Sequence, residues 1–190
     1  MHIGIAHHYG WAAVVVAGDD HAVVERRRIE LIEPGLPVAP IHHEGGAHPM
    51  HRTGPELDDD ALRALVDEVR ASVVRTSATS LDALAADLPG PVASLSLARW
   101  DDLPEAIADL RRPPHESRAD SVMYRQVLAE LAAERRWEVH RYDAKRVEAE
   151  ASALLGVRAE QVLHGPRSLL GAPWGKDQRT ALAAAVLAGS

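Results

Sequence analysis

The chain contains no cysteine and no phenylalanine among its 190 residues. The absence of cysteine excludes disulfide bonds, thiolate metal sites and a cysteine nucleophile. Because aromatic residues are few and Ala, Val and Leu are abundant, we expect a core built from many small aliphatic contacts. Hydrophobic residues make up 46% of the chain, which is enough apolar material to form a buried core at this length.

Long apolar runs and lysines are also scarce. No stretch approaches the roughly 20 apolar residues that span a bilayer, and the segment that starts at Met1 lacks the basic flank of a signal peptide. We therefore expect a cytoplasmic protein without a membrane partner. The two lysines and the formal net charge of −7 are unfavourable for binding phosphate backbones. Nucleic acid is accordingly expected only as a weak partner, through local basic runs such as Arg26–Arg28.

The hydrophobic pattern predicts strands and helices in a definite order. Three strands joined by tight turns come first, over residues 2–7, 11–17 and 21–32. Later elements alternate. A helix begins near Leu57–Asp60 and runs through residue 73, and further helices are expected over 80–86, 104–110, 119–135, 144–155, 158–163 and 176–188. Strands are expected over 92–97 and 137–142. Helices between strands imply parallel crossovers. We expect one α/β domain over 1–190, with a mixed five-stranded sheet flanked by helices.

Residues 33–56 differ from the rest because glycine and proline interrupt every possible long element. A loop of this length is usually functional or disordered. It holds possible metal ligands at His42, His43, Glu44, His48 and His51. Imidazole suits borderline ions such as Zn²⁺ and Mn²⁺, whereas Mg²⁺ prefers oxygen. Two interpretations stay open here: a metal-binding loop, or a mobile loop exposed to solvent.

Short motifs at both ends of the chain carry a family resemblance. Ile3-Gly4-Ile5, a turn and then Gly10–Val15 form an opening hairpin, Tyr142–Val147 follows a strand and opens a helix, and Asp177–Ala183 lies in the last helix. In this order the chain resembles the ribonuclease-H-like superfamily, and within it the RuvC-type Holliday-junction resolvases. The resemblance covers most of the chain and implies a metal-dependent nuclease that acts as a homodimer.

The resemblance also implies a cluster of carboxylates that holds two divalent ions. This chain departs from that pattern at most of the expected positions. Ala6 and His7 stand where the first strand should end in aspartate, Ser96–Arg99 where the fourth strand should offer glutamate, and Thr180 where the last helix should carry its second acid. Asp177 alone matches, so ordinary two-magnesium cleavage is disfavoured.

Histidines at the end of the first strand suggest a substitute site. We expect His7 and Asp177 as catalytic residues, and His7, His8, His42, His43 and Asp177 as ligands of a divalent metal, Mn, Zn or Mg. No organic cofactor is expected, because phosphate-binding glycine motifs are missing. Each residue also has a structural interpretation, since Asp177 suits the first turn of a helix and His140 suits a hydrogen bond within its strand.

Two functions follow from these patterns. The first is a divergent metal-dependent nuclease or phosphodiesterase that uses a His/Asp site. The second is a non-catalytic binding or assembly module that keeps the fold, has lost the metal-binding acids and forms a homodimer. Trp174–Lys176 and Arg99-Trp100 are exposed-looking aromatic and basic segments that either line a binding surface or cover the core.

Overall fold

The computed structural model describes residues 1–190 and contains one five-stranded mixed sheet. Strands β1 (His2–His8), β2 (Trp11–Ala17) and β3 (Val23–Glu30) form an antiparallel meander, and β4 (Ser94–Ala98) and β5 (Glu138–Tyr142) run parallel to β1. The strand order is β3-β2-β1-β4-β5. This order, with helices on both faces, is the ribonuclease-H-like arrangement, so the predicted fold class is confirmed.

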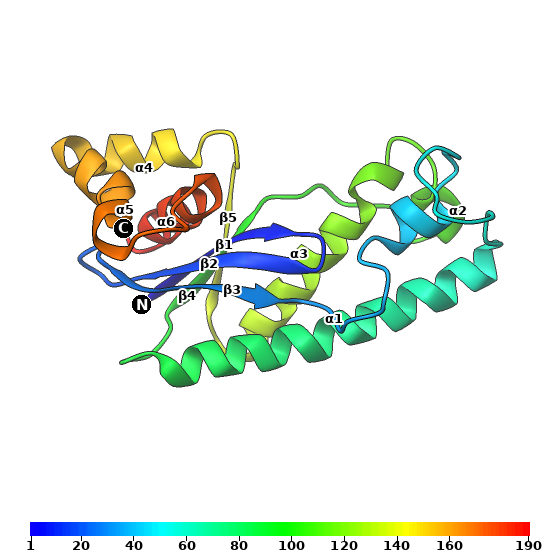
Figure 1. The fold of residues 1–190 in the computed structure, drawn as a ribbon, viewed down its shortest axis with the longest axis horizontal. Helices are drawn as coiled ribbons and strands as arrows, with labels where there is room; N and C mark the ends of the chain where they lie inside the picture. Colours follow the sequence, from blue (N-terminus) through cyan, green and yellow to red (C-terminus); the bar gives the residue numbers. More distant parts are fainter.

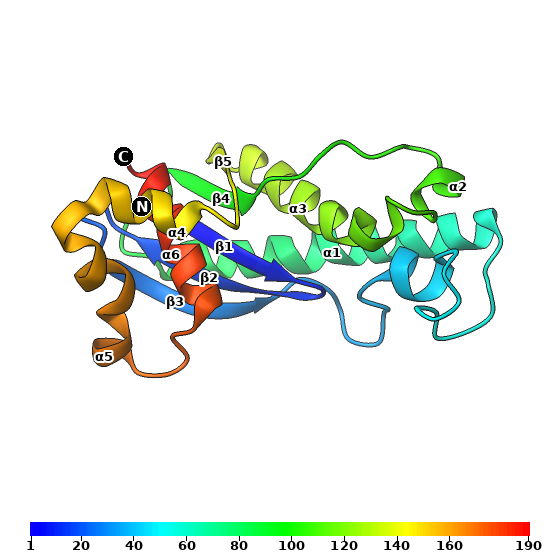
Figure 2. The same cartoon turned by 90° about the horizontal axis from the view of Figure 1, so that it is seen from above.

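Helices cover the two faces of the sheet in separate layers (Figures 1 and 2). On one face lie α1 (Asp59–Asp87) and α3 (Glu116–Glu134), with the short α2 (Ile107–Leu110) beyond the sheet. On the other face lie α4 (Val147–Leu155), α5 (Pro166–Leu170) and α6 (Lys176–Ala188), with the short turns η2 (Gly156–Arg158) and η3 (Glu160–His164) between α4 and α5. None of the helices is both long and apolar enough to cross a membrane.

Alternation along β1 and β2 distributes the core between these two faces. Ile3, Ile5 and Val14 pack with α1 and α3, whereas Ala6 and Ala13 pack with α4 and α6. Successive side chains of a strand point to opposite faces, so each strand contributes to both cores. This alternation also decides where the two histidines at the end of β1 point.

Helix α1 differs from the prediction, because it is continuous where the sequence indicated a break between residues 73 and 80. Serines in this part of the helix bind the last residue of β3 and the residues that follow it instead. Ser80 Oγ donates to the Glu30 carbonyl at 2.8 Å, and Ser77 Oγ to the Leu31 carbonyl at 3.5 Å. Ser72 Oγ accepts from the Glu33 amide at 3.0 Å. Serines therefore stand at helix positions where the prediction required apolar residues, which is why the sequence indicated a break.

The long connection between β3 and α1 is more ordered than its composition indicated. A six-residue π-helical turn, η1 (Pro40–Gly45), lies within it and packs against α1 and α3. The buried Arg111 side chain holds the segment, because its Nε donates to the Gly45 carbonyl at 3.0 Å and its Nη1 binds Asp59 at 2.6 Å. The interpretation of this segment as a solvent-exposed loop is therefore wrong for residues 40–46, none of which is exposed.

Candidate metal centre and sheet-edge site

The carboxyl end of β1 places His7 and His8 on opposite faces of the sheet. His8 lies on the α6 face, where its Nε2 is 2.9 Å from Asp177 Oδ2. His7 lies on the α3 face, where its Nε2 is 3.4 Å from Arg125 Nε. The structure therefore brings Asp177 to β1 as the sequence indicated, but to His8. A strand cannot direct two consecutive side chains to the same ion.

His8 and Asp177 belong to a stacked group of side chains. The His8 ring lies parallel to the Trp11 ring, with 4.2 Å between centroids, and the Arg28 guanidinium is 4.2 Å from the Trp11 ring. A cavity of about 630 Å³ opens beside them and is lined in part by Gln178. This cavity has the size of a small-molecule site, but Asp177 is its only carboxylate.

His7 is held as a neutral imidazole. Burial and then the nearby Arg125 charge lower the pKa of His7 from 6.5 to about 3. A neutral ring accepts a hydrogen bond on Nε2, which suits the Arg125 donor. His7 thus completes the packing between β1 and α3, and its role as a metal ligand stays a prediction.

The lowered pKa of His7 predicts a loss of stability in acid. Between pH 6.5 and 3 the unfolded chain binds a proton at this ring that the folded chain does not, so stability falls as pH falls. We expect the wild-type protein to lose about 3 kcal/mol more than the His7→Gln variant between pH 7 and 4. Urea unfolding of both proteins across this range measures the difference. If the free energy of unfolding falls equally with pH in both proteins, His7 is solvated or charged in the native state.

A second group of ligand-type side chains lies at the amino end of α3. His42 on η1, His51 on the following segment and Glu116 in the first turn of α3 place their ligand atoms within 4.8 Å of one another. Glu116 Oε1 is 3.6 Å from His42 Nδ1 and 3.5 Å from His51 Nδ1. We call these three residues the His–His–Glu triad. His43, whose ring is 5.0 Å from that of His42, is not a member.

Two atoms of the triad are buried and have no hydrogen-bond partner, His42 Nδ1 and Glu116 Oε1. Native structures rarely leave buried polar atoms unpaired, and each case calls for an explanation such as a missing ion. Burial is the main cause that lowers the pKa of His42, followed by the nearby His51 and His43. A lowered pKa keeps the His42 ring neutral at pH 7, which is the form that binds metals.

Backbone contacts fix the triad in place. Asp120 on α3 accepts from the Ile41 amide at 3.1 Å and from the His42 amide at 2.8 Å, and burial raises the pKa of Asp120 to about 7. Gly46 leaves the space that the Glu116 carboxylate fills, because a Cβ at this glycine would lie 2.2 Å from Glu116 Oε1. The triad is therefore positioned by helix, turn and glycine together.

The sequence indicated part of this group. His42 was among the predicted ligands, and His51 was noted in the same segment, but Glu116 was missed. Glu116 lies 65 positions after His51, and no spacing rule connects them. Only the packing of η1 on α3 brings them together.

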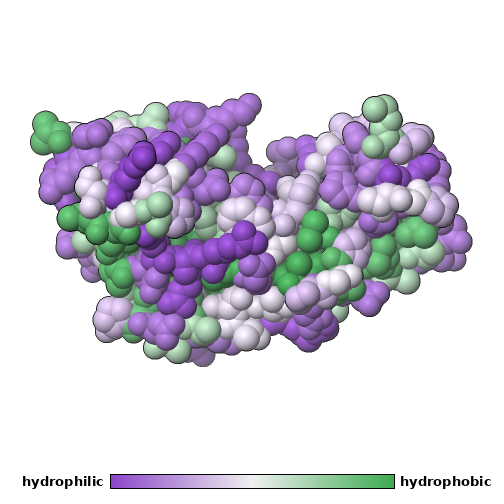
Figure 3. Space-filling model, in the orientation of Figure 1, coloured by the Kyte–Doolittle hydropathy of each residue, from purple (hydrophilic) through white to green (hydrophobic).

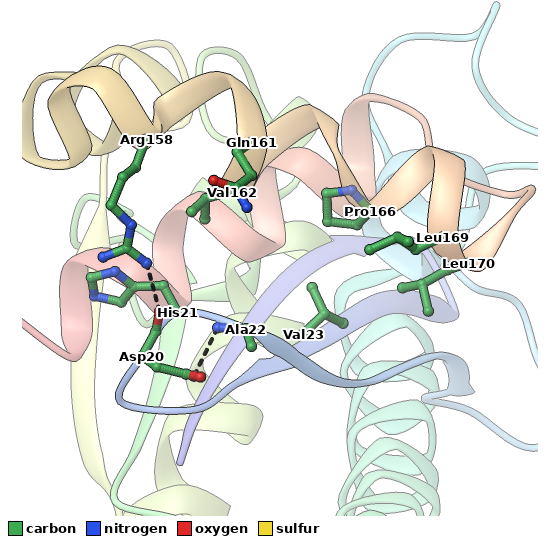
Figure 4. A pocket seen from close by; sticks show the side chains of 10 residues that line it. All are labelled: Asp20, His21, Ala22, Val23, Arg158, Gln161, Val162, Pro166, Leu169 and Leu170. Carbon is green, nitrogen blue, oxygen red and sulfur yellow. Dashed lines mark hydrogen bonds between the residues drawn. The ribbon is translucent and has the colours of Figure 1, made fainter.

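A further cavity, of about 390 Å³, lies between the β2–β3 turn and the segment from η2 to α5 (Figure 4). Arg158 points toward the turn and donates to the Asp20 carbonyl at 2.9 Å, while Val23, Leu169 and Leu170 gather at the other end. None of the predicted catalytic or metal-binding residues lines it. It therefore contributes nothing to the predicted site.

Comparisons with known proteins yield similarity among solved structures only. No protein-family model matches the chain, and no curated protein sequence is similar to it. Among solved structures, T. thermophilus RuvC in complex with Holliday junction substrate is similar, with a TM-score of 0.44 and 14% sequence identity. The match covers 97% of this chain and 89% of that chain. The fold assignment rests on the strand order and the layers, and not on this match.

Proposed function

We propose that the protein is a divergent ribonuclease-H-like hydrolase that holds one divalent metal ion at the His–His–Glu triad and cleaves phosphodiester bonds. One observation carries the proposal: His42 Nδ1 and Glu116 Oε1 face each other at 3.6 Å, buried, with neither atom hydrogen-bonded. His51 Nδ1 completes the group at 3.5 Å from the same oxygen. Two nitrogen ligands and one oxygen ligand are typical of a catalytic zinc site.

The spacing of the triad suits a tetrahedral ion. Ligand atoms about 2.0–2.2 Å from such an ion lie roughly 3.3–3.6 Å from one another. The distances from Glu116 Oε1 to His51 Nδ1 and His42 Nδ1, 3.5 and 3.6 Å, fall in this interval. They exceed the usual length of a direct N–H···O hydrogen bond. Two of the three separations in the triad therefore match those around a shared ion, and all three ligand atoms lie within 4.8 Å of one another.

The donor set favours Zn²⁺ or Mn²⁺ over Mg²⁺, because imidazole is a poor ligand for a hard ion. His51 is 44% exposed, whereas Glu116 is 4% exposed, so one side of the triad opens to solvent. An ion with an open position activates water and polarises a phosphoryl oxygen. Within the chain, Glu116 supplies the negative charge, and Asp120 positions His42 through its backbone amide.

The phosphodiester substrate is supported by fold-level analogy and by the arginines near the carboxyl edge of the sheet. Arg125 donates to the Arg99 carbonyl at 2.8 Å, which places both residues between α3 and the end of β4. Arginine recognises phosphate through planar pairs of donors. A local basic surface is compatible with a protein whose overall charge is negative.

Metal analysis combined with cleavage assays tests the proposal. We expect about one zinc or manganese ion per purified chain, and less than one tenth of that in the His42→Ala and Glu116→Gln variants. His164→Ala is the matched control, because His164 is exposed and distant in sequence from the triad. Cleavage of single-stranded, duplex and branched DNA should follow the metal content. Metal-loaded protein that leaves all three substrates intact would refute the hydrolase, and metal-free protein would refute the site.

A second function is favoured by one observation. The His48 ring lies 4.8 Å from the His51 ring, so His48 is available as a fourth ligand. Four protein ligands make a closed structural site, which would fix the η1 segment on α3 in a non-catalytic module. In that case His48→Ala lowers metal affinity, whereas an open site leaves the affinity of this variant unchanged.

A further inference from the structure

The segment that carries His51, between η1 and α1, has very few side chains directed into the protein. Residues 47–56 are all exposed except Arg52, whose side chain is 13% exposed. Hydrophilic residues also make up much of the surface at the end of the molecule that carries α2 (Figures 1 and 3). Burial of apolar side chains therefore does not hold this segment, so polar contacts must place the ligand that it supplies.

We propose that Arg52 is a positioning residue, which holds His51 against Glu116 and so prepares the His–His–Glu triad for a metal ion. The inference deepens the proposed function, because it rests on the metal site and names the side chain that assembles it. Arg52 makes no hydrogen bond to a ligand atom. It acts instead through the chain that carries His51.

The Arg52 guanidinium reaches back to the turn against which Glu116 lies. Its Nη1 donates to the Gly46 carbonyl at 3.0 Å. Gly46 borders the Glu116 carboxylate, since a Cβ on this glycine would lie 2.2 Å from Glu116 Oε1. His51 directly precedes Arg52, and its Nδ1 is 3.5 Å from the same oxygen. The hydrogen bond to Gly46 thus joins the two sides of the triad.

A carboxylate and a second arginine fix the Arg52 guanidinium. Glu56 Oε2 is 3.3 Å from Arg52 Nη1, and Glu56 Oε1 is 3.0 Å from Arg111 Nη2. The two arginines donate to adjacent carbonyls, Arg111 to Gly45 and Arg52 to Gly46. Glu56 is 53% exposed, so its ion pairs add little stability by themselves. The partly buried, charge-assisted bond to Gly46 is the stronger contact.

Other contacts hold the segment only after His51. The Thr53 amide donates to the His43 carbonyl of η1 at 2.9 Å. Over residues 48–51 the backbone makes one local hydrogen bond, from the His51 amide to the His48 carbonyl at 3.1 Å. Without the guanidinium contact, this stretch is a loop free to move. Ordering a free loop costs conformational entropy, and a ligand that is already held in place avoids this cost when the metal binds.

Zinc titrations in a double-mutant cycle test whether Arg52 acts through His51. We expect Arg52→Ala to bind Zn²⁺ about tenfold more weakly and Arg52→Lys to recover part of the loss, because a single nitrogen makes both contacts. In a His51→Ala background, Arg52→Ala should cause no further loss, since the ligand that it positions is absent. Arg63→Ala, which removes an exposed arginine of α1, is the matched control. Equal losses in the two backgrounds would overturn the inference.

Amide hydrogen exchange of the metal-free protein separates this inference from the metal site. The Thr53 amide should exchange faster in Arg52→Ala than in the wild type, because the segment is released. The His43 amide, which donates to the Ala39 carbonyl at 2.8 Å, should keep its rate, because η1 stays in place. An unchanged rate at Thr53 in a protein that binds zinc overturns the inference alone. A wild type without zinc affinity overturns the metal site, and the inference with it.

Discussion

Replacing Gly46 with alanine lowers the affinity for zinc or manganese at least tenfold and leaves the fold intact. A Cβ at this position would lie 2.2 Å from Glu116 Oε1 and 2.6 Å from Glu116 Cδ, so the carboxylate must leave its place. The backbone at Gly46 has a φ of −59° and a ψ of 146°, which any residue adopts. The substitution therefore acts on the ligand and not on the turn. Calorimetric titration with Zn²⁺ measures the loss.

Gly54→Ala is the control for this prediction, because a Cβ at Gly54 would meet no atom within 4 Å. Both glycines lie in the β3–α1 connection, so the two variants change the same type of residue in the same segment. If Glu116 holds the ion, Gly46→Ala binds zinc or manganese more weakly and Gly54→Ala binds as the wild type does. Equal metal affinity of both variants would show that Glu116 does not hold the ion.

Replacing Gly4 with alanine has the largest expected effect on stability. A Cβ on this residue of β1 would lie 1.7 Å from the Ala181 carbonyl oxygen and 2.6 Å from the Ala181 carbonyl carbon. Backbone atoms of α6 cannot turn aside, so the helix must move away from the sheet. We expect a loss of about 3 kcal/mol or more, at the upper end of the overpacking range, measured by urea unfolding.

The same movement of α6 would also separate Asp177 from His8. We therefore expect loss of the His8–Asp177 hydrogen bond, seen in the His8 imidazole resonances by NMR. Gly90→Ala serves as the control, because its Cβ would make only an ordinary contact, 3.5 Å from Met1 Cε. A Gly4→Ala variant as stable as Gly90→Ala would mean that α6 lies farther from β1 than the structure shows.

The elements predicted best are those with strong local patterns. The final helix has the expected bounds, Lys176–Ala188, and β2 matches its predicted residues, Trp11–Ala17. The antiparallel pairing of the first three strands followed from the hairpin turns, and the parallel direction of the later strands followed from the helical crossovers. In each case, local periodicity and a tight connection leave few other ways to place the element in the fold.

The site was predictable only where the strand geometry determined it. The meeting of β1 with Asp177 followed from the fold, and the choice of His8 over His7 follows from the alternation of a strand. The His–His–Glu triad depends instead on η1 packing against α3, which Asp120 and Arg111 stabilise through backbone carbonyls and amides. Such contacts between distant segments have no periodic signature in the sequence.

The most direct test of the metal centre is a crystal structure of zinc-loaded protein with data collected at the zinc absorption edge. A metal held at the triad gives one strong anomalous peak about 2.0–2.2 Å from His42 Nδ1, His51 Nδ1 and a Glu116 carboxylate oxygen. A zinc-loaded crystal with its peak beside His8 and Asp177, or with no peak near α3, would contradict it.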